Sequence, residues 1–291
     1  MKKKYLILYI LLLTLTVRAN KNLKVPTMGG KLFWTDVKVV NGWKIQENVF
    51  SGHCRLINGK KFRYAWGSKN HCVEELVKLT SLPAKKKTVV LIHGLGVRKQ
   101  SLDPLVEPLE KQGFQVVMFG YSAFFEPLES CADKLESVLS EYNGEIYAVT
   151  HSMGGILLRQ YQQKYRRKIN GAVMIAPPNN GAKIVDSLEK CGVSHLLGVN
   201  GRRLTTDCDG LPKILPGIYS PVLIIAGARK NKYGYFPLLK FMKEDNDGVV
   251  SVETTKLNSP HEHLTIEGYH VNLMKQEIVH QKTIEFLKST N

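Results

Sequence analysis

The sequence has no internal repeat, no low-complexity segment and, after its first nineteen residues, no apolar run long enough to span a membrane. None of its five cysteines shows the spacing of a zinc site. Acidic residues are scarce, since 25 Asp and Glu stand against 41 Lys and Arg for a formal net charge of +16. The basic residues are spread along the chain and no nucleic-acid-binding module is recognisable, so we expect no nucleic-acid partner. The charge favours association with an anionic membrane surface, although many basic proteins simply have basic surfaces.

The first nineteen residues have the pattern of a signal peptide. A positive region, Lys2 to Lys4, precedes an apolar region, Tyr5 to Val17, and small residues ending at Ala19 fit a cleavage site. Thirteen apolar residues are too few for an ordinary spanning helix, which needs about twenty. We therefore expect residues 1–19 to be cleaved and the mature chain, from Asn20, to be secreted, periplasmic or in the cell envelope. Arg18 near the cleavage site leaves an uncleaved membrane anchor as the alternative.

The five cysteines bear on how an exported chain is stabilised, because export allows them to oxidise. Cys54 with Cys72 and Cys191 with Cys208 are the nearest neighbours in sequence, which makes them the first pairings to expect. Connectivity does not follow from sequence, and an odd cysteine must remain. The alternative, given equal weight, is that all five cysteines are free thiols.

Two patterns divide the rest of the chain. Residues 20–84 form a β-rich N-terminal extension, in which Asn41-Gly42 marks a hairpin turn and a helix is expected over residues 71–82. Residues 85–291 alternate short apolar runs with helical segments, which predicts a mostly parallel sheet with helices on both faces. The expected strands are Thr88–Ile92, Phe114–Phe119, Ile146–Val149, Ile169–Ile175, Val222–Ala226 and His263–Ile266, and the expected helices are Ser101–Gln112, Leu128–Glu141, Met153–Lys164 and Asn272–Leu287.

Residues 177–221 interrupt the alternation. This segment contains several Pro and Gly and one weakly amphipathic helix around Lys183 to Lys190. It is a candidate cap or lid, and an ordinary long surface loop is the alternative.

The run Thr150-His151-Ser152-Met153-Gly154-Gly155 follows a buried strand and opens an apolar helix. That context defines a nucleophile elbow, in which a strained turn exposes the Ser152 hydroxyl and small neighbours let strand and helix pass closely. The backbone N–H of Met153 then points at the developing oxyanion. Thr150 stands where the consensus has Gly, so the turn must open slightly there.

A second turn, His93-Gly94-Leu95, also follows a buried strand directly. Such a turn can aim a second backbone N–H at the same oxyanion, and Leu95 is the expected donor. Glycine allows the backbone to approach the substrate closely. His93 is expected to be structural.

The general base should lie late in the chain, because the triad that accompanies such a nucleophile elbow follows the chain order Ser, acid, His. His270 follows the last predicted strand and precedes the closing helix. Three other histidines are expected to be surface or packing residues. His261 and His263 lie before or within the last predicted strand, and His280 lies inside the closing helix.

With these features the chain resembles bacterial lipases and carboxylesterases of the α/β-hydrolase superfamily. Residues 176–181, Ala-Pro-Pro-Asn-Asn-Gly, resemble the P-P-N-x-G run of lipase-like members, and residues 247–252, Asp-Gly-Val-Val-Ser-Val, resemble the loop that bears their acid. The segment from Gly30 to Cys72 resembles an extension of some uncharacterised members. The resemblance implies the α/β-hydrolase fold, a triad of Ser152, Asp247 and His270, oxyanion donors Leu95 and Met153, and no cofactor.

Asp247 is the least secure of these residues, because Glu244 and Asp245 crowd the same loop and Asp-Gly is also a common turn pair. The apolar residues Val249 and Val250 should anchor Asp247 against the core. We therefore expect Asp247 to be the acid.

The expected activity is hydrolysis of a small-molecule or lipid ester through an acyl-enzyme. A thioesterase or acyltransferase would use the same residues, and a non-catalytic envelope-binding protein is the rival from another class. Acyl-chain length, the natural substrate and the oligomeric state do not follow from the sequence.

Overall fold

The computed structural model describes residues 25–26, 31–81, 83, 86–229 and 244–290. The predicted signal peptide, residues 1–19, therefore lies outside the described residues. The chain divides into two compact units, residues 1–83 and 84–291, which are described separately. Among the described residues, no helix is long and apolar enough to cross a membrane.

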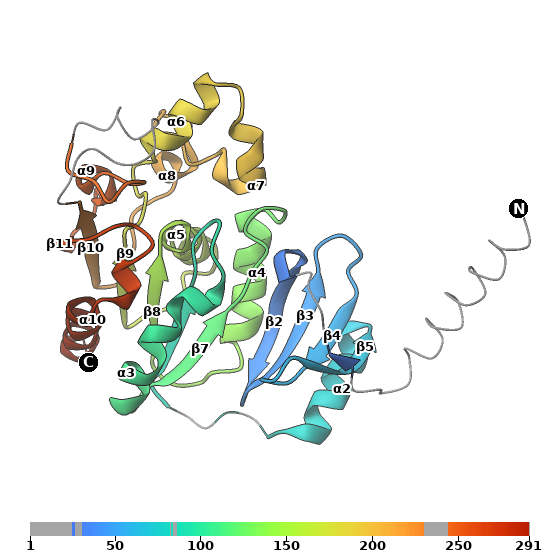
Figure 1. Ribbon diagram of the computed structural model, residues 1–291. Helices are drawn as coiled ribbons and strands as arrows, with labels where there is room; N and C mark the ends of the chain where they lie inside the picture. The colour runs from blue at the N-terminus through green and yellow to red at the C-terminus, as the bar shows by residue number, and fades with distance from the viewer. Residues whose placement is uncertain (1–24, 27–30, 82, 84–85, 230–243, 291) are drawn as a thin grey trace, which may run out of the picture. The chain divides into compact units, whose positions relative to one another are not determined.

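The N-terminal unit is an antiparallel sheet in the order β1-β5-β4-β3-β2, with one helix (Figure 1). Asn41 and Gly42, both with positive φ, form the turn between β2 and β3, as the Asn-Gly pair predicts. The helix starts earlier than expected because Ser68 accepts a hydrogen bond from the backbone N–H of His71 and caps it. The elements are β1 (Val25–Pro26), a 3-10 turn (Lys31–Phe33), β2 (Trp34–Val40), β3 (Trp43–Asn48), β4 (Cys54–Ile57), β5 (Phe62–Gly67) and α2 (Lys69–Leu79).

The core of this unit lies between the sheet and α2 and includes both Cys54 and Cys72. All five cysteines of the chain are free thiols, so neither expected disulfide is present. Burial, with a smaller effect of the Cys54 sulfur, raises the pKa of the Cys72 thiol to about 12. Cys191 and Cys208 are exposed thiols. Proximity in sequence therefore did not predict bonded pairs.

The second unit is built on a six-stranded sheet in the order β11-β10-β9-β8-β6-β7, with every pair parallel. Its central strands are buried on both faces, which explains their unbroken apolar runs. The strands are β6 (Thr88–Ile92), β7 (Gln115–Phe119), β8 (Ile146–His151), β9 (Gly171–Ile175), β10 (Val222–Ala228) and β11 (Glu262–Glu267).

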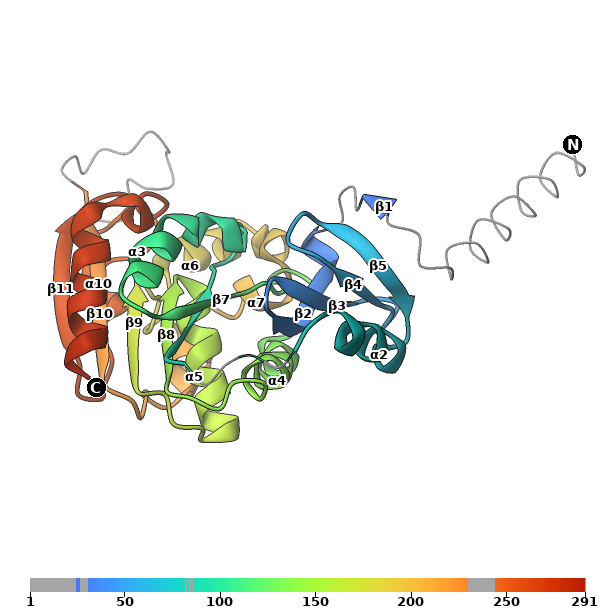
Figure 2. The same ribbon diagram turned by 90° about the horizontal axis from the view of Figure 1, so that it is seen from below.

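Helices cover both faces of this sheet (Figure 2). One face carries a 3-10 segment (Lys99–Leu105), α3 (Val106–Lys111) and α10 (Glu277–Ser289), whose apolar side chains share a core with the sheet. The other face carries α4 (Leu128–Leu139) and α5 (Met153–Tyr165), which pack against each other. The closing helix begins at Glu277, later than expected, because Leu273–Lys275 forms a separate 3-10 turn with Leu273 and Met274 buried.

The strand order places a topological switch point between β6 and β8. After β6 the chain moves outward to β7, and it then returns across β6 to β8 and continues to β11. Loops at the carboxyl ends of strands on either side of such a point diverge and leave room for a ligand. The functional site is therefore expected at the carboxyl ends of β6 and β8.

Residues 177–221 lie over this end of the sheet and contain four short helical segments (Figure 1). The helix expected around Lys183 to Lys190 is α6 (Lys183–Lys190). It is followed by a 3-10 turn (Ser194–Leu197), α7 (Gly198–Gly201) and α8 (Leu211–Ile214). We call this segment the insert.

Candidate active site

Ser152 occupies the sharp turn between β8 and α5. Its backbone dihedrals are φ 54° and ψ −128°, a sparsely populated conformation for a non-glycine residue that costs of order 1–3 kcal/mol. Neighbouring strands enforce this turn, since the Ser152 N–H donates to the Ile175 carbonyl at 2.9 Å. A Cβ on Gly154 would lie 2.4 Å from the Ile92 carbonyl oxygen, so only glycine fits there.

Thr150, which departs from the glycine consensus, is fully buried on β8. Its hydroxyl oxygen would lie 3.4 Å from a Cβ on Gly155. That distance is ordinary van der Waals contact, whereas the same Cβ would lie 3.0 Å from Pro177 Cβ, so the second glycine of the run makes room for Pro177.

Two backbone segments lie next to Ser152. Met153 is the first residue of α5, so its N–H has no acceptor within the helix. On the other side, Gly94 lies so close that a Cβ there would be 2.7 Å from the Ser152 Cβ. Leu95 directly follows Gly94. The β6 turn and the start of α5 therefore meet at Ser152.

His270 lies in the loop after β11 and contacts Asp247. Its Nδ1 is 2.7 Å from Asp247 Oδ2, and its backbone N–H donates to the Asp247 carbonyl at 2.9 Å. A carboxylate accepts only, so Nδ1 carries the proton and Nε2 is left as the acceptor. This is the tautomer that a general base needs.

Asp247 is held rigidly in this position. Its Oδ1 accepts hydrogen bonds from the backbone N–H groups of Val249 at 2.9 Å and Val250 at 2.8 Å. A Cβ on Gly227 of β10 would lie 2.7 Å from the Asp247 Cβ, so the strand end is shaped to admit the acid loop. Glu244 and Asp245 are exposed, and Glu244 pairs with Lys183. Asp247 is therefore the carboxylate of this loop that meets His270.

His151 connects the base to the elbow. Its Nε2 donates to the His270 carbonyl at 3.1 Å, and the two rings lie 4.7 Å apart. Because His151 directly precedes Ser152, His270 lies beside the nucleophile turn. Burial, reinforced by His270, holds the pKa of His151 well below its usual value, so this histidine stays neutral.

His93 and His263 make contacts outside the His270–Asp247 pair. His93 stacks on Tyr121 at 4.4 Å, and its Nδ1 bonds to the Gly94 carbonyl at 2.9 Å. His263 shares a hydrogen bond of 2.9 Å with the Thr255 hydroxyl. Their contacts agree with the structural roles expected for them.

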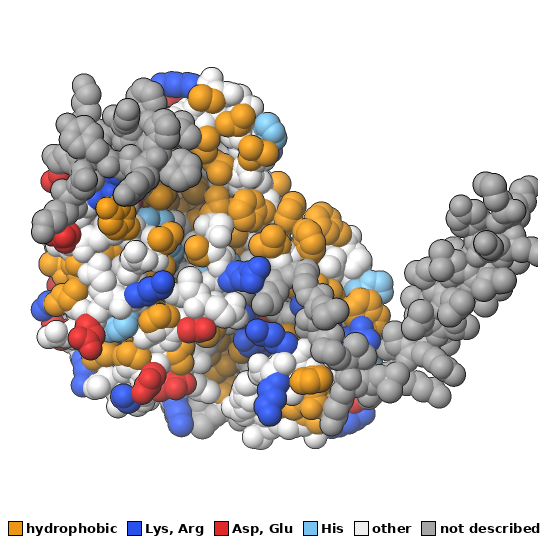
Figure 3. All heavy atoms as spheres, in the orientation of Figure 1, with side chains coloured by type: hydrophobic (Ala, Val, Ile, Leu, Met, Phe, Trp, Pro, Cys, Tyr) orange, Lys and Arg blue, Asp and Glu red, His pale blue; other side chains and the backbone are white. Residues whose placement is uncertain are grey.

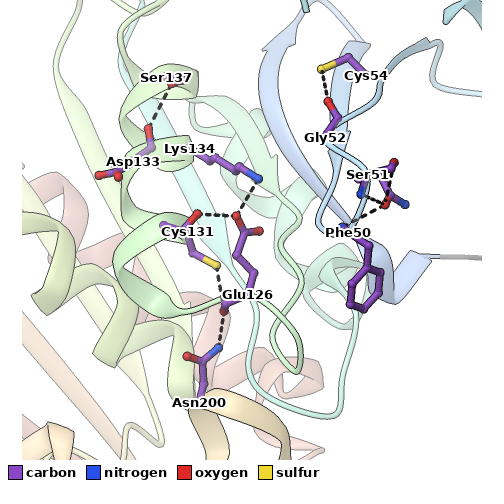
Figure 4. Close-up of polar contacts among 12 residues, drawn as sticks. Phe50, Ser51, Gly52, Cys54, Glu126, Cys131, Asp133, Lys134, Ser137 and Asn200 are labelled. Carbon is purple, nitrogen blue, oxygen red and sulfur yellow. Dashed lines mark hydrogen bonds and ion pairs between the residues drawn. The ribbon is translucent and has the colours of Figure 1, made fainter. Parts of the chain in front are cut away.

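Asn200 is a residue of the site region that sequence reasoning missed. Its side chain is fully buried and donates to the carbonyls of Ala123 at 2.8 Å and Glu126 at 2.7 Å. It also accepts from the first N–H of α4, on Leu128, at 3.0 Å. Figure 4 shows Asn200 bonded to Glu126, whose side chain pairs with Lys134 of α4. An asparagine in a short helical turn carries no sequence signal for such a role.

The contacts of Asn200 seat α7 on the loop after β7, where apolar side chains gather. A Cβ on Gly201 would lie 2.6 Å from both Leu95 Cδ2 and Leu197 Cβ. The backbone of Gly198 abuts that of Phe124, which is followed by Phe125. Hydrophobic side chains are prominent on this face near α7 (Figure 3). We call the five side chains the apolar wall: Leu95, Phe124, Phe125, Leu196 and Leu197.

Comparisons with known proteins agree with this fold. A family model described as Serine aminopeptidase, S33 (Hydrolase_4) matches residues 83–204, which include Ser152. The mature form of the Bacillus licheniformis lipase BlEst2 superposes with a TM-score of 0.55 at 16% identity, covering 71% of this chain and 94% of the lipase.

The phospholipase PlaB of Legionella pneumophila also gives a TM-score of 0.55, at 17% identity over 70% of this chain and 60% of that one. No curated protein matches the sequence. The chain has the α/β-hydrolase fold with an antiparallel β-rich N-terminal unit, and it resembles lipases and esterases of that superfamily.

Proposed function

We propose that the chain is an exported serine hydrolase that cleaves carboxylic esters. The observation that carries the proposal is the bond between His270 Nδ1 and Asp247 Oδ2, 2.7 Å long, beside the strained turn at Ser152. A binding protein has no need of a buried carboxylate–imidazole pair next to a serine in a strained turn, so this geometry favours catalysis.

The mechanism is two-step acyl transfer to water. His270 Nε2 takes the proton of the Ser152 hydroxyl as Ser152 attacks the ester carbonyl carbon. The N–H groups of Leu95 and Met153 bind the oxyanion of the tetrahedral intermediate, and His270 then protonates the leaving alcohol. Water attacks the acyl-enzyme with His270 again as base, which releases the acid and restores Ser152. Asp247 holds the His270 tautomer throughout.

The apolar wall supports an ester with a hydrocarbon acyl chain as the substrate. It begins at the proposed oxyanion donor Leu95 and reaches solvent at Phe125 and Leu196, which are 42% and 68% exposed. Two of its residues, Leu196 and Leu197, belong to the insert, which is short and partly polar, so we propose short to medium acyl chains. A thioesterase or acyltransferase would use the same residues, and a substrate panel separates them.

The test of the chemistry is Ser152→Ala, with Ser137→Ala as its matched control. Ser137 lies on α4, and its hydroxyl donates to the Asp133 carbonyl at 3.1 Å. Ser152→Ala should lower esterase activity by roughly four or more orders of magnitude and abolish labelling by a fluorophosphonate probe. Ser137→Ala should keep both. A folded Ser152→Ala protein with a tenth of the wild-type activity would end this proposal.

The substrate class is tested with p-nitrophenyl esters from acetate to palmitate, alongside thioesters and emulsified triglyceride. We expect the highest kcat/KM on esters between butyrate and octanoate. Maximal turnover on long-chain triglyceride, with little on those esters, would contradict the proposed chain length.

Export is tested separately, because it rests on residues 1–19 of the sequence alone. We expect the protein outside the cytoplasm with its N-terminus near Asn20, measured by fractionation and intact mass. A soluble cytoplasmic protein that retains Met1 to Arg18 would contradict export without affecting the proposed chemistry.

A further inference from the structure

Arg159 is a buried cation that the mechanism does not use. It lies on α5, the helix that Ser152 opens, and is 3% exposed. Burial lowers its pKa to about 10, so it remains charged at neutral pH. Its hydrogen bonds all go to amide and carbonyl oxygens. They reach Pro216 O at 3.0 Å, Pro212 O at 2.9 Å, Leu215 O at 2.5 Å, Asn179 O at 3.0 Å and Asn179 Oδ1 at 3.3 Å.

The guanidinium fixes the orientation of the Asn179 side chain. A guanidinium only donates, so Asn179 must turn Oδ1 toward Arg159 and Nδ2 away from it. Nδ2 then donates to the Thr255 carbonyl at 2.8 Å. Asn179 is 2% exposed, so a side chain that lost these partners would leave buried polar groups unpaired.

Asn179 and its neighbour bind the carboxyl end of α9 (Val252–Thr255). The backbone N–H of Asn180 donates to the Thr254 carbonyl at 2.9 Å, and its Nδ2 donates to the Lys256 carbonyl at 2.7 Å. Terminal carbonyls of a helix have no donor within the helix. The Asn179-Asn180 pair supplies donors to three successive carbonyls.

The other end of α9 is continuous with the loop that carries Asp247. The Val252 N–H donates to the Asp245 carbonyl at 2.8 Å, and the Asp247 N–H donates to the Val250 carbonyl at 3.1 Å. Asn246 and Ser251 pair across the base of this loop. The loop and α9 therefore form one closed piece of chain, and a displacement of α9 moves Asp247.

We propose that Asn179, oriented by Arg159, is a positioning residue for Asp247. The inference rests on the proposed function, in which Asp247 holds the base. Arg159 and Ser152 belong to the same helix, whereas Asp247 comes from a segment far along the chain. The contacts from Arg159 through Asn179 to α9 fix the acid relative to the nucleophile.

The test is Asn179→Ala, compared with Gln162→Ala. Gln162 also lies on α5 and is 2% exposed, and it bonds to the Ser220 hydroxyl at 2.7 Å, which ties α5 to the end of the insert without touching α9. Because a misplacement of about 1 Å can cost about a hundredfold, Asn179→Ala should lower kcat on p-nitrophenyl butyrate by about 10- to 100-fold. KM should stay within about twofold, since no substrate contact is removed.

A second readout does not depend on activity. The proton shared by His270 Nδ1 and Asp247 should give a strongly deshielded proton NMR signal in the wild type. Asn179→Ala should broaden, shift or remove it, whereas Gln162→Ala should retain both the signal and kcat. Equal losses in the two variants would overturn the proposal, because they would report general destabilisation of α5.

Wild-type kcat and an unchanged signal in folded Asn179→Ala would also overturn it. Should Asn179→Ala fail to fold, Asn180→Ala removes the side-chain bonds to the Lys256 carbonyl and from Lys213 Nζ but keeps the backbone bond to the Thr254 carbonyl. It should show a smaller change in the same signal. No change there would overturn the proposal. A wild-type protein that fluorophosphonate does not label would refute the proposed function alone, since the NMR comparison still reports on Asp247.

Discussion

A methyl group added at Gly94 is the sharpest test of how the β6 turn and the nucleophile elbow fit together. The Cβ of Gly94→Ala would lie 2.7 Å from the Ser152 Cβ and 3.1 Å from the His151 carbonyl oxygen. Ordinary van der Waals contact begins near 3.4 Å, so the two carbons must separate by about 0.7 Å. Neither partner can yield as a flexible side chain would, because the contacts are with a Cβ and backbone of the elbow.

The separation must displace either Ser152 or the Leu95 N–H from the reacting carbonyl. A misplacement of about 1 Å can cost about a hundredfold in rate, so Gly94→Ala should lower kcat/KM by about 10- to 100-fold. That loss corresponds to about 1.4–2.7 kcal/mol of transition-state stabilisation. Overpacking should also lower the free energy of unfolding by about 1–3 kcal/mol.

The assays are p-nitrophenyl butyrate hydrolysis, the rate of fluorophosphonate labelling, and thermal unfolding. Gly59→Ala is the control, because its added Cβ meets only the Gly42 carbonyl oxygen at 3.8 Å. It should change none of the three. Wild-type kcat/KM in Gly94→Ala would refute the proposed fit of the two turns around Ser152.

Three further outcomes are expected. Asp247→Asn should lower kcat by roughly two to four orders of magnitude, because an amide in place of Oδ2 favours the wrong His270 tautomer. Asp245→Asn, a surface change, should cost less than about tenfold, and the reverse ranking would make Asp245 the acid. Arg159→Met should lower the free energy of unfolding by about 4 kcal/mol in urea titrations, counting about 1 kcal/mol for each of the four backbone carbonyls left unpaired. A loss under about 1 kcal/mol would contradict the role of these bonds. Burial raises the pKa of the Cys131 thiol well above its usual value. Ellman's reagent should therefore modify exposed Cys191 quickly and Cys131 only on unfolding. Fast modification of Cys131 in the native protein would contradict this expectation.

Most of the strands and helices of the second unit could be predicted because local signals set them. Unbroken apolar runs mark the central strands, and β6 has the predicted bounds Thr88–Ile92. Segment ends were less predictable, since they depend on packing. The segment around Pro104 begins as a 3-10 helix, and the closing helix starts at Glu277 after a separate turn.

Part of the candidate site could likewise be predicted from local sequence, and part could not. The surroundings of Ser152 follow from a strand–turn–helix pattern within a few residues, whereas the meeting of His270 with Asp247 depends on how separate loops pack. Arg159 and Asn200 carried no local signal, and the lipase-like run at residues 176–181 assigned no role to Asn179, because each of the three bonds to carbonyls far away in the sequence. A polar residue that bonds to distant backbone looks like any other polar residue until the fold is known.

The bonds of Arg159 to both ends of the insert affect how far the length of the insert can change. One guanidinium binds Asn179 near the start of the insert and Pro212 to Pro216 near its end, so the intervening chain is a loop whose ends are already joined. Lengthening such a loop costs little, because closure entropy grows only with the logarithm of its length. The chain between Asn180 and Pro212 can therefore be lengthened at little cost in closure entropy while the elbow and the acid loop keep their contacts. Under the proposed function, such a change would fit the site to a different acyl chain. In the proposed enzyme, the insert is thus the part whose length can change specificity without moving α5 or the acid loop.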